Sequence, residues 1–554
     1  MRLLTQSGNT GPAVLIFALA FVFLAVAMGH GVNFYDEGII LEGAARVSAG
    51  AVVHRDFYAN YGPGQFYVIA GLFKMFGTSV LVERAWDTSI RAGVVALAFC
   101  IVRQVGRPLD GVFAAALTAV WLGAVGTYGY PVFPAEFFTL LAVLLMTPLF
   151  ADRRLVSSLL GCGICIGVTV LFRYDVGFYA FVGLNGAATA HVLTRKPSVG
   201  APFRELLRVL SPIWLGTAAV CVPVAAAYVV SGAMPDFIFD IVTYPTHYYA
   251  RMRSLPFPGS ADLISAPDKF AVYLPIPIAL AAVATLALAK APEMDSDARP
   301  ATARRSLVLL LTLLCGLFFL KGWVRVSVEH MVLSIICALI LAVALLVYAR
   351  SAIPRHGAMP LMIASALALI VAVVPTIAVA KIVAANVANG LAWALRPATW
   401  AATRHAPEFA SCRPPPGLER VACFAIDTNR ANAALYIHGR SQPTDTVFIG
   451  VVGYDRIVVN DVLTYFVMGM KPATKWYHFD PGLQTTAEIQ RKVIQELAAQ
   501  KPRFVMTETH LDDFPEPNES SVSSGVNLLD DYILANYRPI HTFGNIVVMQ
   551  SLVP

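Results

Sequence analysis

The chain has 554 residues, of which 57% are hydrophobic and 14% are charged, and its formal net charge is +6. This composition excludes an ordinary soluble enzyme, and it gives no indication of nucleic-acid binding. Many apolar runs are about 17 to 22 residues long, enough to cross a bilayer core of about 30 Å. We therefore predict a polytopic α-helical membrane protein.

About eleven apolar segments are predicted to span the membrane. The first follows a single early arginine and has no convincing cleavage site, so we expect an uncleaved span rather than a signal peptide. The predicted spans are residues 13–29, 88–104, 110–126, 133–150, 156–172, 176–193, 211–230, 270–289, 306–321, 328–348 and 359–379.

Basic residues indicate the orientation of these spans. If the N-terminus is cytoplasmic, alternation of the spans places every short arginine-rich loop on the cytoplasmic side, as the positive-inside rule requires. The same alternation places residues 30–87, residues 231–268 and the end of the chain on the opposite face. We therefore expect a bacterial inner-membrane protein, with a membrane domain over residues 1–380 and a periplasmic domain over residues 381–554.

Two helices are predicted in the first long loop, residues 30–87. Glu42–Ala49 has the composition of a short helix. Gln65–Phe76 is apolar except for Lys74, too short to span a bilayer, and typical of a helix that lies at the membrane interface. This loop is therefore more than a linker.

The end of the chain has the composition of a soluble α/β domain, and its roughly 150 residues are enough to bury a core. Cys412 and Cys423 can form a disulfide if this part is extracytoplasmic. Its predicted elements are the strands Thr446–Val452 and Arg503–Thr507, the helices Thr486–Ala499 and Leu528–Asn536, and a hairpin of Pro539–Phe543 with Ile546–Gln550.

Polar residues gather at the predicted non-cytoplasmic ends of the spans. Asp36 and Glu37 directly follow the first span, where two adjacent acids are either solvated at a helix end or exposed to a wet cavity. Charged side chains at membrane depth are costly and usually face a polar cavity or a partner. The other candidates at this face are His54, Asp56, Tyr61, Arg84, Glu136, Arg173, Arg325 and His330.

Each of these residue types suits a chemical task, and each has a structural alternative. Acids can act as a general base or as ligands of a divalent metal ion, and arginines can hold a phosphate by paired hydrogen bonds. In the alternative, Arg84 pairs with Glu83, Arg173 pairs with Asp175, and His330 is an interfacial cap. Because unrelated structural needs would scatter such groups over both faces, their gathering favours a functional site.

Short motifs of the first loop carry a resemblance to a known family. In order, they are Tyr35-Asp36-Glu37-Gly38, His54-Arg55-Asp56-Phe57, Tyr61-Gly62-Pro63-Gly64-Gln65-Phe66-Tyr67, Phe76-Gly77 and Arg84. Their order and spacing resemble the GT-C membrane glycosyltransferases, on the glycosyltransferase family 39 branch of protein O-mannosyltransferases and lipid A aminoarabinose transferases. This branch has a proline where Gly62 stands and commonly an aromatic residue where Arg55 stands. The resemblance covers the chain to about residue 350.

The resemblance implies a GT-C fold and an inverting enzyme. Such an enzyme moves a sugar, here a hexose or a pentose, from a polyprenyl-phosphate donor to a cell-envelope glycan, lipid or protein at the periplasmic face. By the same resemblance, Asp36 is the base for the acceptor hydroxyl, and Glu37 and Glu136 are further acids of the site. A divalent metal ion is a possible cofactor, with Asp36 and Glu136 as its ligands.

Other roles also follow only from the resemblance. The cationic groups near the donor phosphate are expected to be Arg84, Arg173, Arg325 and His330, and the substrate-binding residues His54, Asp56 and Tyr61. Members of the family often have an aspartate between the last arginine and histidine of this set. Here Glu329 is the acid in that interval.

Two other classes of function are weighed against this one. A transporter or flippase of lipid-linked sugars is disfavoured, because the best acids lie at one face and no inverted repeat of broken helices is evident. A non-enzymatic membrane scaffold leaves the polar cluster unexplained. The C-terminal domain carries no catalytic motif, and we expect it to bind the acceptor, to shape the mouth of the cavity or to act as a stabilising cap.

Overall fold

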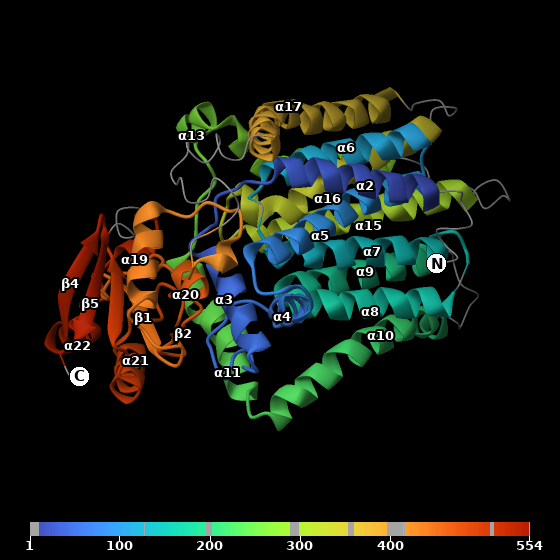
Figure 1. Cartoon of the computed structure of the whole chain (residues 1–554). Helices are drawn as coiled ribbons and strands as arrows, with labels where there is room; N and C mark the ends of the chain where they lie inside the picture. Colours follow the sequence, from blue (N-terminus) through green and yellow to red (C-terminus); the bar gives the residue numbers. More distant parts are fainter. Residues whose placement is uncertain are drawn as a thin grey trace.

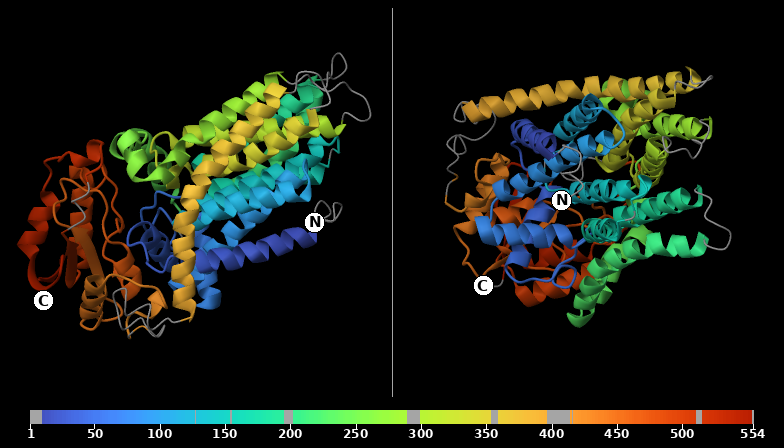
Figure 2. Two further views of the ribbon diagram at one scale, coloured as in Figure 1. Left: turned by 90° about the horizontal axis from the view of Figure 1, so that it is seen from above. Right: turned by 90° about the vertical axis from the view of Figure 1, so that its right-hand side faces the viewer.

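The computed structural model places a bundle of apolar helices beside a mixed α/β domain (Figure 1), and Figure 2 gives the same arrangement from two further sides. This confirms the predicted fold class. The structure describes residues 10–126, 128–153, 155–194, 202–288, 299–352, 359–395, 414, 416–509 and 515–552. Cys412 lies outside these residues, and with it the predicted Cys412–Cys423 disulfide.

Each predicted span corresponds to a helix of the bundle. Nine of the helices in the described chain are long and apolar enough to cross a membrane, and α6 and α8 are shorter apolar helices. The helices are α2 (Thr10–Ala27), α5 (Val80–Arg103), α6 (Pro108–Ala124), α7 (Val132–Phe150), α8 (Val156–Phe172), α9 (Tyr174–Thr194), α10 (Pro202–Val230), α14 (Pro275–Leu288), α15 (Arg299–Gly322), α16 (Val328–Ala352) and α17 (Met359–Leu395).

Burial distinguishes the centre of the bundle from its rim. Helix α16 is apolar on all sides, and 94% of its spanning segment is buried. In α2 and in α10, only 17% of the spanning segment is buried. A helix that is apolar all round is stable either in a protein core or in lipid. Helix α16 is therefore the core of the bundle, and α2 and α10 present apolar surfaces to the bilayer.

Several helices differ in length from the sequence prediction, among them α5 and α17. Helix α5 begins at Val80 rather than at residue 88, because its charged first turns are neutralised by close ion pairs such as Arg84–Glu37 at 2.5 Å. Helix α17 continues from the predicted end at residue 379 to Leu395, and so runs through the predicted domain boundary at residue 380.

The first loop forms α3 (Asp36–Ser48) and α4 (Gly64–Phe76), so both predicted helices are present and α3 begins six residues before its predicted start at Glu42. Helix α3 lies between the bundle and the C-terminal domain (Figure 1). The chain approaches α4 through Gly62, where a Cβ atom would stand 2.3 Å from the carbonyl oxygen of Leu171. Glycine removes this clash, so the first loop packs directly against the end of α8.

The segment 231–273 is also largely helical. Two π-helical turns in it, η1 and η2, carry aromatic residues toward the bundle end; π-helical turns occur frequently at functional sites. Its elements are α11 (Met234–Ile238), η1 (Phe239–Thr243), η2 (Pro245–Tyr249), α12 (Ala250–Met252), α13 (Ser260–Ser265) and η3 (Pro267–Tyr273).

The C-terminal domain is built on a five-stranded sheet of order β2-β1-β3-β5-β4. Strand β1 is parallel to β2 and β3, while β5 runs antiparallel to β3 and β4. Its elements are η6 (Glu419–Val421), α19 (Thr428–His438), β1 (Thr446–Val451), α20 (Leu463–Met468), β2 (Lys471–Pro472), α21 (Ala487–Gln500), β3 (Phe504–Glu508), η7 (Glu519–Ser521), α22 (Leu528–Asn536), β4 (Tyr537–Phe543) and β5 (Ile546–Ser551).

Alternating residues of the sheet pack against two helical layers. Phe448 of β1 and Val505 of β3 pack with α21 and α22, whereas Ile449 and Met506 pack on the side of α19 and α20. The second of these cores is continuous with the core of the bundle. The predicted strands, the two predicted helices and the hairpin are confirmed; α21 begins at the N-cap Thr486, whose hydroxyl accepts the N–H of Ile489.

Candidate active site

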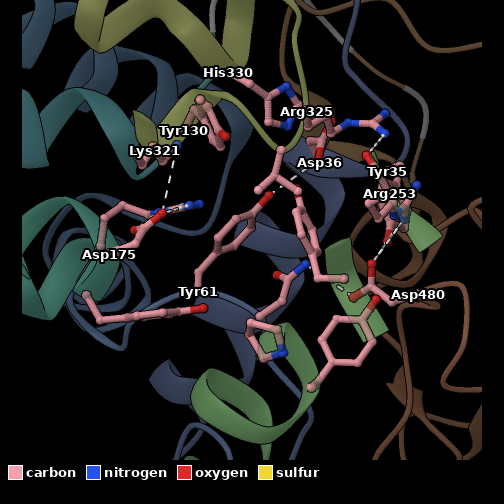
Figure 3. A pocket seen from close by; sticks show the side chains of 18 of the residues that line it. Tyr35, Asp36, Tyr61, Tyr130, Asp175, Arg253, Lys321, Arg325, His330 and Asp480 are labelled. Carbon is pink, nitrogen blue, oxygen red and sulfur yellow. Dashed lines mark hydrogen bonds and ion pairs between the residues drawn. The ribbon is translucent and has the colours of Figure 1, made fainter. Parts of the chain in front are cut away.

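A polar cavity of 380 Å³ lies where the end of the bundle meets the C-terminal domain (Figure 3). Its walls come from six separate parts of the chain: the first loop, the α6–α7 and α8–α9 connections, the segment after α10, the α15–α16 turn and the C-terminal domain. The polar residues that line it include Asp36, Tyr61, Tyr130, Arg173, Asp175, Arg253, Lys321, Arg325, His330, Asp480 and Glu516.

Asp36 stands in the first turn of α3. The side chain of Asn33 starts the helix by accepting the backbone N–H of Tyr35 at 2.9 Å and of Asp36 at 2.8 Å. The Tyr61 hydroxyl donates to the Asp36 carboxylate at 3.4 Å. Burial raises the pKa of the Asp36 carboxyl, while the positive charges of Arg253 and Arg325 oppose that increase. Asp36 is therefore a half-buried carboxylate with a raised proton affinity.

The other acids that line the cavity are all held by arginines. Asp175 receives two hydrogen bonds from Arg173, at 2.7 and 3.0 Å. Glu516 receives two from Arg325, at 2.6 and 2.7 Å. Asp480 pairs with Arg253 at 3.0 Å. Among the acids that line this cavity, Asp36 alone makes no ion pair.

Two further nitrogen-bearing groups line the cavity, the Lys321 ammonium and the His330 imidazole. The Lys321 ammonium lies 3.8 Å from the Asp175 carboxylate. This ion pair is long, and the ammonium keeps N–H donors that can bind a ligand. The Nδ1 atom of His330 lies 2.9 Å from the Ser327 hydroxyl, which fixes the orientation of the imidazole. In Figure 3 Lys321 lies beside Asp175 and Tyr130, whereas His330 lies nearer to Asp36 and Arg325. The cavity therefore opposes one unpaired carboxylate to a group of cations.

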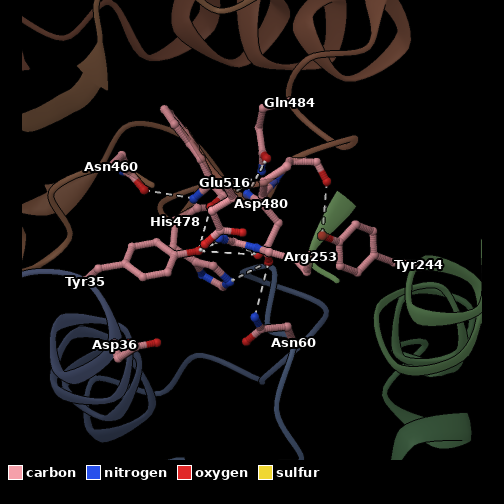
Figure 4. Close-up of polar contacts among 12 residues, drawn as sticks. Tyr35, Asp36, Asn60, Tyr244, Arg253, Asn460, His478, Asp480, Gln484 and Glu516 are labelled. Carbon is pink, nitrogen blue, oxygen red and sulfur yellow. Dashed lines mark hydrogen bonds and ion pairs between the residues drawn. The ribbon is translucent and has the colours of Figure 1, made fainter. Parts of the chain in front are cut away.

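The C-terminal domain contacts the residues on both sides of Asp36 through hydrogen bonds and close packing (Figure 4). The Tyr35 hydroxyl donates to the carbonyl oxygen of Phe479 at 2.6 Å, and the backbone N–H groups of Val462 and Leu463 donate to the Phe34 carbonyl at 3.0 and 2.9 Å. A Cβ atom on Gly38 would stand 2.6 Å from the backbone nitrogen of Leu463. The start of α3 is thus fixed by the domain rather than by the bundle alone.

Asp480 joins three parts of the chain at the wall of the cavity. Its carboxylate accepts hydrogen bonds from Tyr58 at 2.9 Å, from Asn60 at 3.2 Å and from Arg253 at 3.0 Å. The Tyr35 hydroxyl lies 3.4 Å away. This saturated, buried carboxylate connects the first loop, the segment after α10 and the C-terminal domain.

Five of the residues predicted from sequence meet in this cavity: Asp36, Tyr61, Arg173, Arg325 and His330. The structural salt bridge between Arg173 and Asp175 is also present. Arg173 therefore both lines the cavity and pairs with Asp175. The topology expectation that these groups share one end of the bundle agrees with their common cavity.

Glu37 and Arg84 are not brought into this cavity. Arg84 donates to Glu37 at 2.5 and 2.8 Å, and also to the carbonyl oxygens of Gly29 and Gly31 at 2.9 Å each. Arg84 lies 3.7 Å from Glu83 as well, so the predicted contact with Glu83 is secondary to that with Glu37. These hydrogen bonds connect α5 with the start of α3 and with the chain that follows α2.

Glu136 lies inside the bundle, on α7, and does not line the cavity. It is fully buried, and neither of its carboxylate oxygens has a hydrogen-bond partner among the described residues. Asp36 and Glu136 therefore do not share one site. Within the described residues, no group of three or more His, Cys, Asp or Glu side chains lies close enough to bind a metal ion.

His54 and Asp56 are also outside the cavity. The buried His54 ring pairs through Nδ1 with Asp240 at 2.8 Å, and burial lowers the pKa of His54 to about 3. Asp56 accepts two hydrogen bonds from Arg55, at 2.8 and 2.9 Å, and one from the backbone N–H of Val52 at 2.7 Å. Each stabilises the first loop.

Sequence reasoning did not identify some important side chains of the cavity. Arg253, Asp480 and Glu516 line it, and the last two come from a domain without a recognisable motif. The stretch from Tyr244 to Arg253 is rich in aromatic and basic residues, a signal in the sequence that could have found this wall. Nothing in the local sequence distinguishes Asp480 from a solvated acid.

A separate apolar cavity of 240 Å³ adjoins the polar one. It lies between α8, α10 and η1 and is lined by residues such as Leu171, Val224 and Ile241. Tyr174 lines both cavities. An amphipathic molecule with a polar head and an apolar tail would match this pair of surfaces.

No protein-family model and no curated protein matches the chain. Solved structures do match it over nearly its whole length. ArnT from Cupriavidus metallidurans bound to undecaprenyl phosphate is 16% identical, with 98% of this chain and 99% of that chain covered and a TM-score of 0.55. The apo state of the same protein is 15% identical, with 98% of each chain covered and a TM-score of 0.54.

The archaeal oligosaccharyltransferase AglB from Archaeoglobus fulgidus is 12% identical, covers 90% of this chain and 69% of its own, and has a TM-score of 0.49. The similarity to ArnT shows that this chain has the GT-C fold. The fold expected from the motifs of the first loop is therefore confirmed.

Proposed function

We propose that this protein is a membrane glycosyltransferase, which moves a sugar from a polyprenyl-phosphate carrier to a hydroxyl group of a cell-envelope acceptor. One observation carries the proposal: in a single cavity of 380 Å³, the unpaired carboxylate of Asp36 is opposed to a group of cations. Displacement at an anomeric carbon needs a base for the attacking hydroxyl and positive charge at the leaving phosphate.

The proposed reaction is one displacement. The acceptor hydroxyl donates its proton to Asp36 as its oxygen attacks the anomeric carbon. The bond between that carbon and the phosphate oxygen breaks, and the electron pair leaves with the polyprenyl phosphate. Because attack and departure occur on opposite faces of the carbon, the configuration inverts, and no glycosyl-enzyme intermediate forms. Tyr61, through its hydrogen bond, holds the Asp36 carboxylate toward the cavity.

Arg173, Lys321, Arg325 and His330 are the groups we propose for the leaving phosphate. Lys321 and His330 have donors beyond their observed contacts, whereas the two arginines are engaged by Asp175 and Glu516. A phosphate can share donors of an arginine that keeps its carboxylate, because guanidinium has five N–H groups. We propose instead that Arg84 and Glu37 have a structural role, because they form an ion pair with each other outside the cavity.

The apolar cavity supports a lipid-linked donor. Because Tyr174 borders both spaces, the phosphate and sugar of a polyprenyl phosphate would enter the polar cavity while the first isoprene units lie against Leu171 and Val224. Similarity of fold to ArnT, whose crystal structure contains undecaprenyl phosphate, supports the same class of donor. We propose that the cavity faces the periplasm of a bacterial cell, as the basic loops predict.

In vitro transfer tests this function. Purified protein in lipid nanodiscs would receive a panel of labelled polyprenyl-phosphate hexoses and pentoses together with cell-envelope extract. Transfer should occur with wild-type protein and with Glu488→Gln, a matched control at an exposed position of α21. It should fall by at least about 100-fold in Asp36→Asn. Equal transfer by Asp36→Asn and wild type would refute the assignment of the base.

A further inference from the structure

A second cavity, of 710 Å³, lies where α3 meets the C-terminal domain. It borders the last turns of α3, strand β2 and the end of α21, and it shares no lining residue with the polar cavity. Seven of its 18 lining residues are alanine or glycine, so the space is not filled by side chains.

Glu42 is an unusual residue in the wall of this cavity. It is only 3% exposed, yet within the described chain it makes no hydrogen bond and no ion pair. The nearest opposing charges that act on it are those of Arg46 and Arg420. Burial raises the pKa of Glu42 to about 7. Its carboxylate oxygens are not among the fully enclosed unpaired atoms, so they are open to the cavity, where a hydrogen-bond donor could bind them.

Arg46, on the next turn of α3, has a side-chain nitrogen without a hydrogen-bond acceptor among the described residues. Its Nη2 donates to the Asp56 carbonyl at 2.7 Å, but its buried Nη1 has no acceptor among the described residues. The guanidinium is held between the rings of Phe57, at 4.9 Å, and Tyr477, at 5.5 Å. That Nη1 is fully enclosed, so a ligand in the cavity cannot reach it; the Glu42 carboxylate, in contrast, lacks a partner among the described residues and is open to the cavity.

A hydroxyl group supplies the donor that Glu42 lacks, and its oxygen can accept a hydrogen bond from another donor of the wall. The remaining charges of the cavity also favour a hydroxyl-bearing ligand over an anion. Its basic residues are Arg46, Arg420, Lys471 and Lys475, and they are nearly balanced by Glu42, Asp56 and Glu496. A phosphate placed here would meet the Glu42 carboxylate, which repels it.

We propose that this second cavity is a saccharide-binding subsite, in which Glu42 and Arg420 bind hydroxyl groups of a glycan. The inference rests on the proposed function in assigning that glycan to the acceptor. Both cavities border α3, and Asp36 and Arg46 are ten residues apart on it, about 15 Å along the axis. An acceptor glycan of several sugar units would be held at its distal units while its reacting hydroxyl approaches Asp36.

Binding measurements on the full chain in nanodiscs test this subsite without any donor. Saturation-transfer NMR would be recorded with maltotriose, mannotriose, di-galacturonate and inorganic phosphate as probes. At least one oligosaccharide should bind wild type and Asp36→Asn equally well. Its affinity should fall by about tenfold or more in Glu42→Gln and in Arg420→Gln, and it should be unchanged in the surface control Glu488→Gln.

Three outcomes would overturn the proposal. They are the failure of every oligosaccharide to bind, equal binding by the Glu42→Gln and wild-type proteins, and displacement of a bound saccharide by millimolar phosphate, which would indicate an anion site. If Glu42→Gln lowers the melting temperature, its weaker binding could come from a damaged fold, and Lys471→Ala is measured instead. Lys471 is exposed on the edge strand β2 and lines the cavity, so Lys471→Ala should weaken oligosaccharide binding, and unchanged binding would overturn the proposal.

The subsite and the proposed function fail in different ways. Loss of the subsite alone would raise the KM for a glycan acceptor and leave kcat and donor binding unchanged. If the wild-type protein transferred no sugar from any donor and yet bound oligosaccharides through Glu42 and Arg420, the proposed transfer would be rejected and the subsite retained.

Discussion

The carboxylate of Asp480 lies 3.0 Å from the guanidinium of Arg253, and the pair forms part of the cavity wall between the C-terminal domain and the segment after α10. Both side chains are nearly inaccessible to solvent, at 2% and 8% exposure. Removal of one partner from a buried pair leaves an uncompensated charge. The pair therefore couples the stability of the domain contact to the shape of the cavity.

Asp480→Asn should destabilise the protein by about 3 to 5 kcal/mol and should lower kcat, because Tyr35 and the first turn of α3 lose their anchor. Thermal unfolding in detergent and transfer kinetics would measure the two effects. Glu488→Gln, which breaks an exposed ion pair on α21, serves as the control and should change neither. An unaltered melting temperature in Asp480→Asn would contradict the coupling.

Lys321→Gln should weaken donor binding more than it weakens catalysis by a bound donor. Its ammonium has unspent donors and lines the cavity beside Arg173. Loss of one charged hydrogen bond to a phosphate corresponds to about tenfold or more in affinity. Binding of a fluorescent polyprenyl phosphate would measure this, with Lys269→Gln, whose half-exposed side chain lies outside the cavity, as the matched control.

Glu136→Gln separates the structure from the family resemblance. The resemblance assigns a second acid of the site to Glu136, whereas the side chain is buried in the bundle away from the cavity. Transfer should fall by less than about tenfold, well short of the loss of about 10² to 10⁴ that removal of a general base causes. Because the amide carries no buried charge, the melting temperature should stay equal or rise. A loss comparable to that of Asp36→Asn would restore Glu136 to the site.

The pH dependence of transfer should reflect Asp36. Burial raises the pKa of its carboxyl, so the basic form needed to accept a proton is populated only at higher pH than for an ordinary aspartate. The rate should increase with pH through that raised pKa and then level off. Since Glu42 also titrates near pH 7, the profile of Glu42→Gln must be recorded; its acid limb should coincide with that of the wild type.

The stability of the protein should decrease between pH 4.5 and 7 through Glu42. Burial raises the pKa of Glu42 from its ordinary value of 4.5 to about 7, so over that interval the folded protein binds more protons than the unfolded chain. Stability falls with pH wherever the folded state binds the excess of protons. Glu42→Gln should flatten this part of the profile, measured by thermal unfolding. An unchanged slope would show that other groups cause it.

Periodicity and composition were sufficient for most of the fold, because spans and alternating strands are local properties of the chain. Each predicted span matches a helix, and the hairpin of β4 and β5 follows from Gly544-Asn545 between two apolar runs. The early start of α5 escaped prediction because its charges are neutralised by residues remote in sequence, as in the pairing of Arg84 with Glu37.

The candidate site was predictable only in part. Asp36 and Tyr61 belong to motifs of fixed spacing, and Arg173 and His330 stand at the ends of spans, so the sequence points to them. Asp480 reaches the cavity through contacts with residues more than 200 positions away. Such a contact leaves no local trace in composition or periodicity.

The distance in sequence between Asp36 and Glu516, which line one cavity, bears on how the protein is made. A ribosome releases the first of these residues long before the last, and the membrane helices are inserted in the interval. The cavity is complete only when the final domain has folded against α3. Nascent and truncated chains would therefore lack the part of the cavity wall that Asp480 and Glu516 form.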